Sequence, residues 1–327
     1  MIIPLVKHLA PNLLSKPEYG LTRDGYGHGV VEAGELNPNI AVLCCDLTES
    51  TRSHWFREKF PERFIEVGVA EQNMAGIAAG MAAEGFVPFI SSYAVFSPGR
   101  NWDQIRVSVC YSNTNVKIMG AHAGISVGPD GATHQALEDM AIMRVLPNMV
   151  VLAPCDMEET RKAIHAAALY DGPVYVRFAR EKTAVITTAK SPFAIGKAEV
   201  FSQGEDVTLV ACGPLLYETL HAAQVLLKSG VRAEVINMPS LKPFDEKTLL
   251  ASVKKTGCVV TVEEHQITGG LFGAVAETLA QTMPVPIIPV GMHDTFGQSG
   301  TPDELLELYG MQAKNIVAAA RAVVRKK

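Results

Sequence analysis

One stretch, Gly68 to Gly85 (GVAEQNMAGIAAGMAAEG), limits the possible folds of this chain more than any other. It is almost wholly small and apolar, and it places a carboxylate, Glu71, at the head of a predicted helix. Gly76 and Gly80 lie four residues apart, so one helix face is bare enough for another backbone to approach closely. Such an approach would bury Glu71, and a buried carboxylate is costly to ionise. The helix dipole also favours an acid in the first turn, so a purely structural role for Glu71 stays open at this point.

The length and composition predict two hydrophobic cores and a surface that packs against a partner chain. A length of 327 residues is enough for about two domains. Charged residues make up only 19%, hydrophobic residues 48%, and the mean hydropathy is +0.15, which indicates surface buried against another chain. The net charge of −5 argues against binding to nucleic acid. No apolar run is long enough to cross a bilayer, and residues 1–16 lack the order of a signal peptide, so we expect a cytoplasmic chain.

Cysteine spacing excludes two classes of stabilising site. No CxxC pair occurs among the six cysteines, so neither a zinc site nor a disulfide framework is indicated. We expect buried thiols at most of these positions: Cys44, Cys45, Cys110, Cys155, Cys212 and Cys258.

Strands and helices alternate along the whole chain. In the first half, short apolar runs predict strands at 40–45, 63–67, 87–90, 116–119, 149–152 and 174–178. In the second half, similar runs predict strands at 207–211, 233–237, 258–262 and 286–290. Between them the pattern loosens around Ser191-Pro192 and Gly204. We therefore expect two doubly wound α/β domains, residues 1–187 and 188–327, with polar loops gathered at the carboxyl ends of parallel strands.

Five segments of the sequence together match one enzyme family: GVAEQNM, SSYAVF, GPDGATHQ, DLTES and VTVEEHQITGG. They closely resemble the C-terminal half of transketolases, the thiamine-diphosphate enzymes that transfer two-carbon ketol units. The resemblance covers essentially the whole chain. It implies the small subunit of a split transketolase, with the pyrimidine-binding domain followed by the transketolase C-terminal domain.

The family's metal-binding motif is missing from this sequence. Thiamine-diphosphate enzymes hold Mg²⁺ or Ca²⁺ and the diphosphate with Gly-Asp-Gly and a later Asn. The Asp-Gly pairs here, at 24–25, 130–131 and 171–172, have no preceding Gly. The resemblance therefore implies a larger, diphosphate-binding partner subunit in an α2β2 heterotetramer, and no metal ligands in this chain.

The resemblance assigns four residues to the cofactor. Glu71 matches the acid that shares a proton with N1′ of the aminopyrimidine ring, a task suited to a buried carboxyl group. Tyr93 and Phe96 match aromatics that pack against the same ring, although two core aromatics are the structural alternative. Asp46 matches an aspartate close to the cofactor.

The resemblance also implies substrate-binding residues. His134 and Asp130 match positions that contact the substrate near the scissile carbon, and His134 is expected to be catalytic as well. A turn-stabilising role is the alternative for Asp130. Donors expected to bind a sugar phosphate come from separate loops: Arg23, Ser50, His122 and Arg180. For Ser50 taken alone, a helix cap is the simpler interpretation.

Other functions remain open from the sequence. Gln72-Asn73 and Pro98-Gly99-Arg100 depart from long transketolases and leave the exact substrate undetermined. Alternative enzymes are a β-type subunit of a 2-oxoacid dehydrogenase and a 1-deoxyxylulose-phosphate-synthase-like enzyme, and the non-enzyme alternative is a regulatory subunit. The run from Glu263 to His265 suggests a metal cluster, but neighbouring strand residues face opposite sides, so we interpret it as structural.

Overall fold

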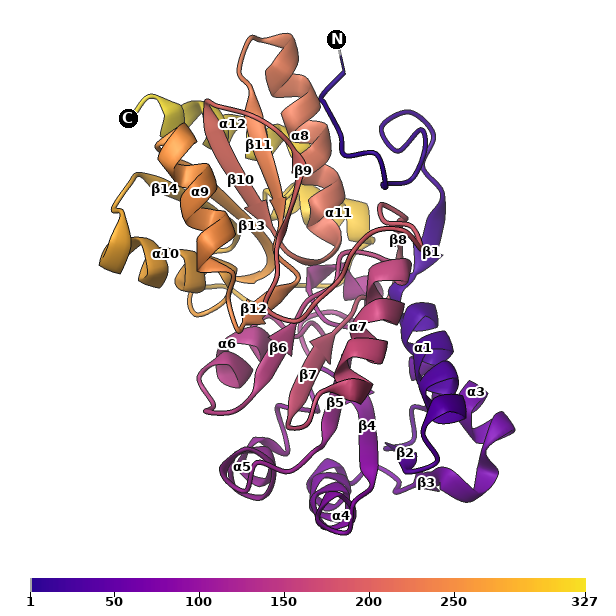
Figure 1. The fold of residues 1–327 in the computed structure, drawn as a ribbon. Helices are drawn as coiled ribbons and strands as arrows, with labels where there is room; N and C mark the ends of the chain where they lie inside the picture. The colour runs from indigo at the N-terminus through magenta and orange to yellow at the C-terminus, as the bar shows by residue number, and fades with distance from the viewer. Residues whose placement is uncertain (1) are drawn as a thin grey trace.

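The computed structural model describes residues 2–327, which form two α/β units stacked end to end (Figure 1). The first unit contains a sheet with the strand order β12-β6-β7-β5-β4-β2-β3. Its strands are β2 (Ile40–Cys44), β3 (Phe64–Glu66), β4 (Val87–Tyr93), β5 (Lys117–Ala121), β6 (Val150–Leu152), β7 (Val174–Arg177) and β12 (Ser240–Lys242). Neighbouring strands are parallel, except that β12 pairs antiparallel with β6. The predicted α/β fold is confirmed.

Helices cover both faces of this sheet, so the central strands β2, β5 and β7 are buried along their whole length. One face packs against α1 (Thr22–Leu36) and α7 (Met157–Leu169). The other packs against α4 (Glu71–Ala83), η2 (Ile105–Tyr111) and α6 (Asp139–Arg144). Shorter helices complete the unit: α2 (Thr48–Thr51), α3 (Ser53–Lys59), η1 (Pro61–Arg63), α5 (Trp102–Gln104) and η3 (Ile125–Asp130).

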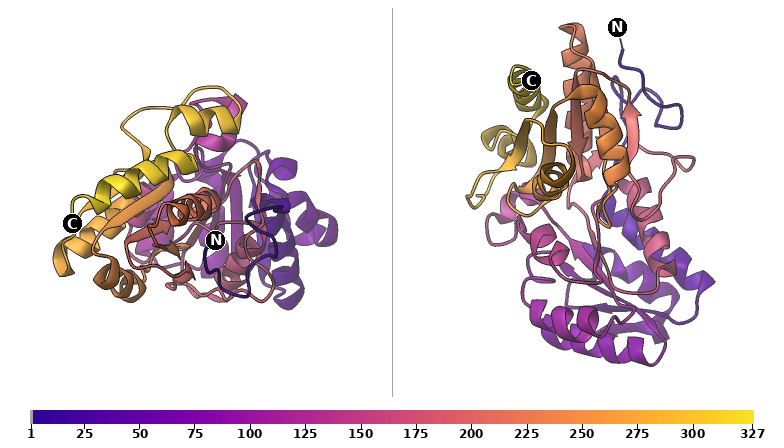
Figure 2. Two further views of the ribbon diagram at one scale, coloured as in Figure 1. Left: turned by 90° about the horizontal axis from the view of Figure 1, so that it is seen from above. Right: turned by 60° about the vertical axis from the view of Figure 1, so that its left-hand side comes forward.

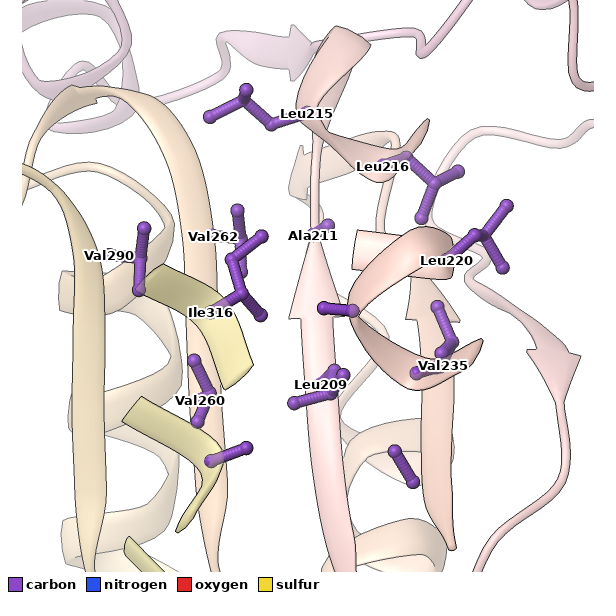
Figure 3. Packing of buried hydrophobic residues seen from close by; sticks show 14 of the residues in the cluster. Leu209, Ala211, Leu215, Leu216, Leu220, Val235, Val260, Val262, Val290 and Ile316 are labelled. Atoms are coloured by element: carbon purple, nitrogen blue, oxygen red, sulfur yellow. The ribbon is translucent and has the colours of Figure 1, made fainter. Parts of the chain in front are cut away.

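The second unit has a smaller sheet with the order β14-β13-β10-β11-β9. Its strands are β9 (Glu199–Ser202), β10 (Val207–Ala211), β11 (Ala233–Asn237), β13 (Val259–Gln266) and β14 (Ile287–Met292). Its helices are η4 (Gly213–Leu215), α8 (Leu216–Lys228), α9 (Glu246–Thr256), α10 (Leu271–Thr282), α11 (Pro302–Leu308) and α12 (Ala313–Val324). Figure 3 shows how Leu209, Val260, Leu220 and Ile316 join this sheet to α8 and α12.

Short edge elements connect the two units and were not predicted. β1 (Tyr19–Leu21) pairs with β8 (Lys182–Ala184), and β12 carries a segment from the second half of the chain into the first sheet. The sequences of β1 and β8, YGL and KTA, are not the apolar runs that predict a strand. The start of the chain lies along the second unit, where Leu5 bridges to Ser202 (Figure 2). The limits 1–187 and 188–327 stay a prediction.

The strand order places several polar loops next to one another. From β2 the chain forms β3 on one side and then β4 on the other side of β2, so the winding direction of the sheet reverses there. Ligands bind at such a switch point, at the carboxyl ends of parallel strands. All six cysteines are buried and free, and within residues 2–327 no helix is both long and apolar enough to span a membrane.

Candidate active site

Glu71 is the buried carboxylate at the centre of this edge of the sheet. It is the first residue of α4 and is only 1% exposed. Its Oε2 accepts a hydrogen bond of 2.6 Å from Nη1 of Arg100, and Ser92 Oγ lies 3.5 Å from Oε1. Asn101 Nδ2 donates to the Glu71 carbonyl over 3.2 Å. The predicted burial of Glu71 is confirmed, and its side chain has a single strong ionic partner.

Arg100 was not predicted as that partner. It follows Pro98-Gly99, a segment that the sequence marked only as a departure from long transketolases. Its side chain is 47% exposed, and its guanidinium carbon lies 4.7 Å from the centre of the Phe96 ring. The Arg100 guanidinium therefore contacts both the Phe96 ring and the buried Glu71 carboxylate. Its positive charge offsets part of the free-energy cost of burying that carboxylate.

Four rings from three segments form one cluster beside Glu71. The Tyr93 ring, at the end of β4, stacks on the His122 ring, after β5, with centroids 4.1 Å apart. The Phe96 ring stacks at 6.0 Å from the Tyr93 ring. The His134 ring meets the Tyr93 and Phe96 rings edge-on at 6.2 and 5.4 Å. The structure thus brings together Tyr93 and His134, which lie about 40 positions apart in the chain.

His122 is neutral near physiological pH. Burial, reinforced by the positive charges of Arg23 and Arg180, lowers its pKa to about 3. Its backbone has a φ of +54°, an uncommon value for a residue other than glycine. Within residues 2–327 its Nδ1 is buried without a hydrogen-bond partner. His122 therefore has unused hydrogen-bonding capacity in electropositive surroundings.

Of the predicted phosphate-binding donors, Arg23 contacts Ser50, while Arg180 contacts the segment that carries Asp130. Arg23 Nη1 donates to the Ser50 carbonyl over 3.1 Å, so Ser50 contributes its backbone to this contact. Arg180 Nη1 donates to the Val127 carbonyl over 2.8 Å and to Asp130 Oδ1 over 3.3 Å. Burial and the positive charge of Arg52 lower the pKa of Arg23. Surroundings that lower the pKa of a cation favour a bound anion.

Asp46 lies apart from the ring cluster. Its side chain is exposed, and its backbone, with φ +55°, donates to Glu66 Oε1 over 2.7 Å. In the part of the chain that the structure describes, no contact joins the Asp46 side chain to Glu71 or the rings. Its role near a cofactor stays a prediction.

Glu263, Glu264 and His265 do not converge on one point. Glu263 accepts hydrogen bonds from the backbone N–H groups of Leu271 and Phe272 over 2.6 and 2.8 Å, at the start of α10. Glu264 instead accepts from Ser126 in the first unit. Burial raises the pKa of Glu263 to about 8 and lowers the pKa of His265 to about 4. These contacts agree with the structural interpretation of the run.

Comparisons with known proteins bear on both units. Residues 21–185 match the family model described as transketolase, pyrimidine binding domain, and residues 196–316 match transketolase, C-terminal domain. A protein of Methanocaldococcus jannaschii that carries the name transketolase C-terminal section is 45% identical, over 93% of this chain and 96% of that protein. The 6-deoxy-6-sulfo-D-fructose transketolase subunit SqwH of a Clostridium species is 42% identical, over 93% of this chain and 95% of that subunit.

A solved structure is also similar along nearly its whole length. It is described as split gene transketolase, inactive beta4 tetramer. It shares 46% sequence identity with this chain and superposes with a TM-score of 0.88, covering 94% of this chain and 99% of its own.

Proposed function

Because the chain belongs to the transketolase family, we propose that it is the small subunit of a two-chain transketolase that is active only with its partner. The observation that carries this proposal is Glu71, a carboxylate 1% exposed, which lies beside a ring cluster at the carboxyl edge of the sheet. Relatives named as a C-terminal section and as a subunit match this chain over more than 90% of both lengths, which supports a division into two polypeptides.

Family membership implies thiamine diphosphate as the cofactor, and the residues present fit its pyrimidine end. Glu71 offers a buried carboxylate, and Tyr93 and Phe96 offer a ring pair beside it. Nδ1 of His122 is a buried polar atom without a partner among the described residues. When bound, the cofactor supplies an acidic C2 position. In this proposal Glu71 holds a proton at N1′ and the rings hold the pyrimidine in place.

We assign the diphosphate and its Mg²⁺ or Ca²⁺ to the larger partner subunit. The reason is the sequence, in which no Asp-Gly pair follows a glycine. The exposed face of α4 is the proposed docking surface, because a Cβ added at Gly76 or Gly80 would meet no atom within 4 Å. In Figure 1, α4 lies at the end of the first unit furthest from the second. We propose an α2β2 heterotetramer with its sites between chains.

The proposed substrates are sugar phosphates. Asp130 and His134 are placed to contact the sugar near the reacting carbon, and Arg23, His122 and Arg180 to bind its terminal anion. The charges of Arg23 and Arg180 both act on His122, which supports a common anion pocket. A related subunit is named for a sulfonated sugar, so a sulfonate is the alternative terminal group.

Reconstitution tests whether activity requires both chains. We expect the purified chain alone to give no thiamine-dependent turnover. Mixed with the partner, thiamine diphosphate and Mg²⁺, it should form a heterotetramer that transfers ketol units. Robust transfer by the single chain would refute the two-chain assignment.

Arg180→Ala tests the substrate class. An arginine–phosphate contact is charge-assisted, so its loss should remove about 1.5–3 kcal/mol of binding, chiefly as a higher KM for phosphorylated aldoses. Unphosphorylated aldoses should barely respond. Arg232→Ala is a matched control, because Arg232 forms an exposed ion pair with Glu205 in the second unit. Equal losses for both substrates would make Arg180 structural, and a wild-type preference for sulfonates would change the natural substrate.

A further inference from the structure

The segment from Gly124 to Gln135, here called the substrate loop, carries Asp130 and His134 but is held by the second unit. Glu264 Oε2, on β13, accepts a hydrogen bond of 2.8 Å from Ser126 Oγ and one of 3.2 Å from the Ser126 N–H. Glu264 and Ser126 are 138 residues apart in the chain. One carboxylate oxygen of the C-terminal domain therefore anchors the beginning of the loop.

Gly124 makes room for this anchor. Its φ is +93°, and a Cβ at this position would lie only 2.2 Å from Glu264 Oε2. Any side chain would therefore be strained and would also collide with the carboxylate. The absence of a side chain at Gly124 therefore leaves space for the Glu264 carboxylate.

The end of the loop is held by a different segment of the second unit. Gln135 is 3% exposed, and its Nε2 donates to the carbonyls of Ile125, inside the loop, and Gln298 over 3.1 and 3.0 Å. The beginning and end of the loop are thus tied to each other and to the residues that precede α11.

Glu264 itself is fixed by a buried ionic network. Arg177 donates to the Glu264 carbonyl over 3.2 and 3.3 Å, and its Nε lies 2.9 Å from Asp139 Oδ2. Tyr175 also donates to that Asp139 oxygen, over 2.7 Å. Burial raises the pKa of Glu264. Because the backbone at Glu264 is held by this network, its side chain extends toward Ser126 from a fixed point outside the loop.

We infer that Glu264 is a positioning residue for substrate binding, through which the C-terminal domain holds Asp130 and His134 in register with the rings. This inference rests on the proposed role of those two residues. In this inference the second unit has a function in the reaction, although that unit contributes no residue to the ring cluster.

Two measurements test the inference, using the variants Glu264→Ala, Glu264→Gln and Ser126→Ala. The first is amide hydrogen exchange of residues 124–135, followed by mass spectrometry on the folded chain, which requires no activity. We expect exchange about tenfold faster in Glu264→Ala and an intermediate change in Ser126→Ala. Gln still offers an oxygen acceptor, so Glu264→Gln should largely restore protection.

The second measurement uses the reconstituted enzyme. Glu264→Ala should raise the KM for the sugar phosphate about tenfold, the change expected for loss of one charge-assisted hydrogen bond. Exchange of the thiamine C2 proton, which depends on Glu71, should not change. Glu234→Ala is the matched control, because Glu234 is a 1% exposed carboxylate of the same unit that binds Lys255 and the Gly204 N–H instead of the loop.

The outcomes separate the two claims. Loop exchange no faster than in Glu234→Ala would overturn the anchor, and faster loop exchange with an unchanged KM would overturn the positioning role. If Glu264→Ala does not fold, Ser126→Ala answers the same questions from the loop side. If the wild-type pair shows no ketol transfer, the proposed function fails, while the exchange experiment still shows whether Glu264 holds the loop.

Discussion

The molecule buries glutamates in two regions, one at Glu71 and the other at Glu263 and Glu264. The carboxylates of the two regions have different kinds of hydrogen-bond partner. The Glu71 side chain is bound by an arginine that is 47% exposed. Glu263 is bound by two backbone N–H groups at the start of α10, and Glu264 by Ser126. The partner of Glu71 is a side chain, whereas the partners of Glu263 and Glu264 include backbone N–H groups. Burial alone therefore does not identify a catalytic acid, and the proposal for Glu71 rests also on its half-exposed partner and on the nearby rings.

Glu71→Gln tests the catalytic side of this comparison and has the largest expected effect. Gln keeps the size and a hydrogen-bonding group but removes the acid proton. In the reconstituted enzyme we expect C2 proton exchange, followed by NMR, to slow by ~10² to 10⁴, as for other losses of general acid–base catalysis. The chains should still assemble.

Glu84→Gln is the control for that experiment, because Glu84 is an exposed acid at the opposite end of the same helix. It should exchange C2 at the wild-type rate. Normal exchange in Glu71→Gln as well would make Glu71 a first-turn acid and would remove the distinction between the two regions.

Glu263→Gln tests the other region of this comparison, through the pH dependence of the free energy of unfolding. Burial raises the folded-state pKa of Glu263 from 4.5 to about 8. Below pH 4.5 both states are protonated. Between pH 4.5 and 8 the unfolded chain loses its proton first, so the folded state becomes less stable as the pH rises. The full shift corresponds to up to about 5 kcal/mol.

The measurement is urea unfolding of wild type and Glu263→Gln from pH 4.5 to pH 8. Gln cannot ionise, so the variant should lose less stability over this range, and Glu84→Gln should follow the wild type. Parallel curves for wild type and Glu263→Gln would mean that Glu263 does not titrate in this window.

Local patterns predicted most of the fold and part of the site. Strands such as β2 and β10 were predictable because each is a short, fully buried apolar run. Glu71 was predictable because a charge at the head of an alanine- and glycine-rich helix is unusual within its own segment. β1, β8 and β12 were not, because their sequences, YGL, KTA and SLK, are not apolar runs.

Contacts between distant segments could not be predicted from one sequence. Arg100 reaches Glu71 across 29 positions, and Ser126 reaches Glu264 across 138. Neither pair has a local period that links its members. Gly124 itself is visible in the sequence, but its φ of +93° and its close approach to Glu264 are seen only in the structure.

Arg100→Met has the smallest expected effect and tests whether the Glu71 region is open. Because the Arg100 side chain is 47% exposed while the Glu71 side chain is 1% exposed, losing this ion pair should cost between the about 1 kcal/mol of an exposed pair and the about 3 kcal/mol of a sealed one. Salt screens exposed charges, so this loss should shrink when the urea unfolding is repeated in 1 M NaCl. The effect of Glu263→Gln should not depend on salt, because its hydrogen bonds are internal. Arg232→Met, at an exposed surface pair, provides the control for general screening. A loss above about 3 kcal/mol that salt leaves unchanged, the size expected for breaking a sealed ion pair, would show that Glu71 is as enclosed as Glu263.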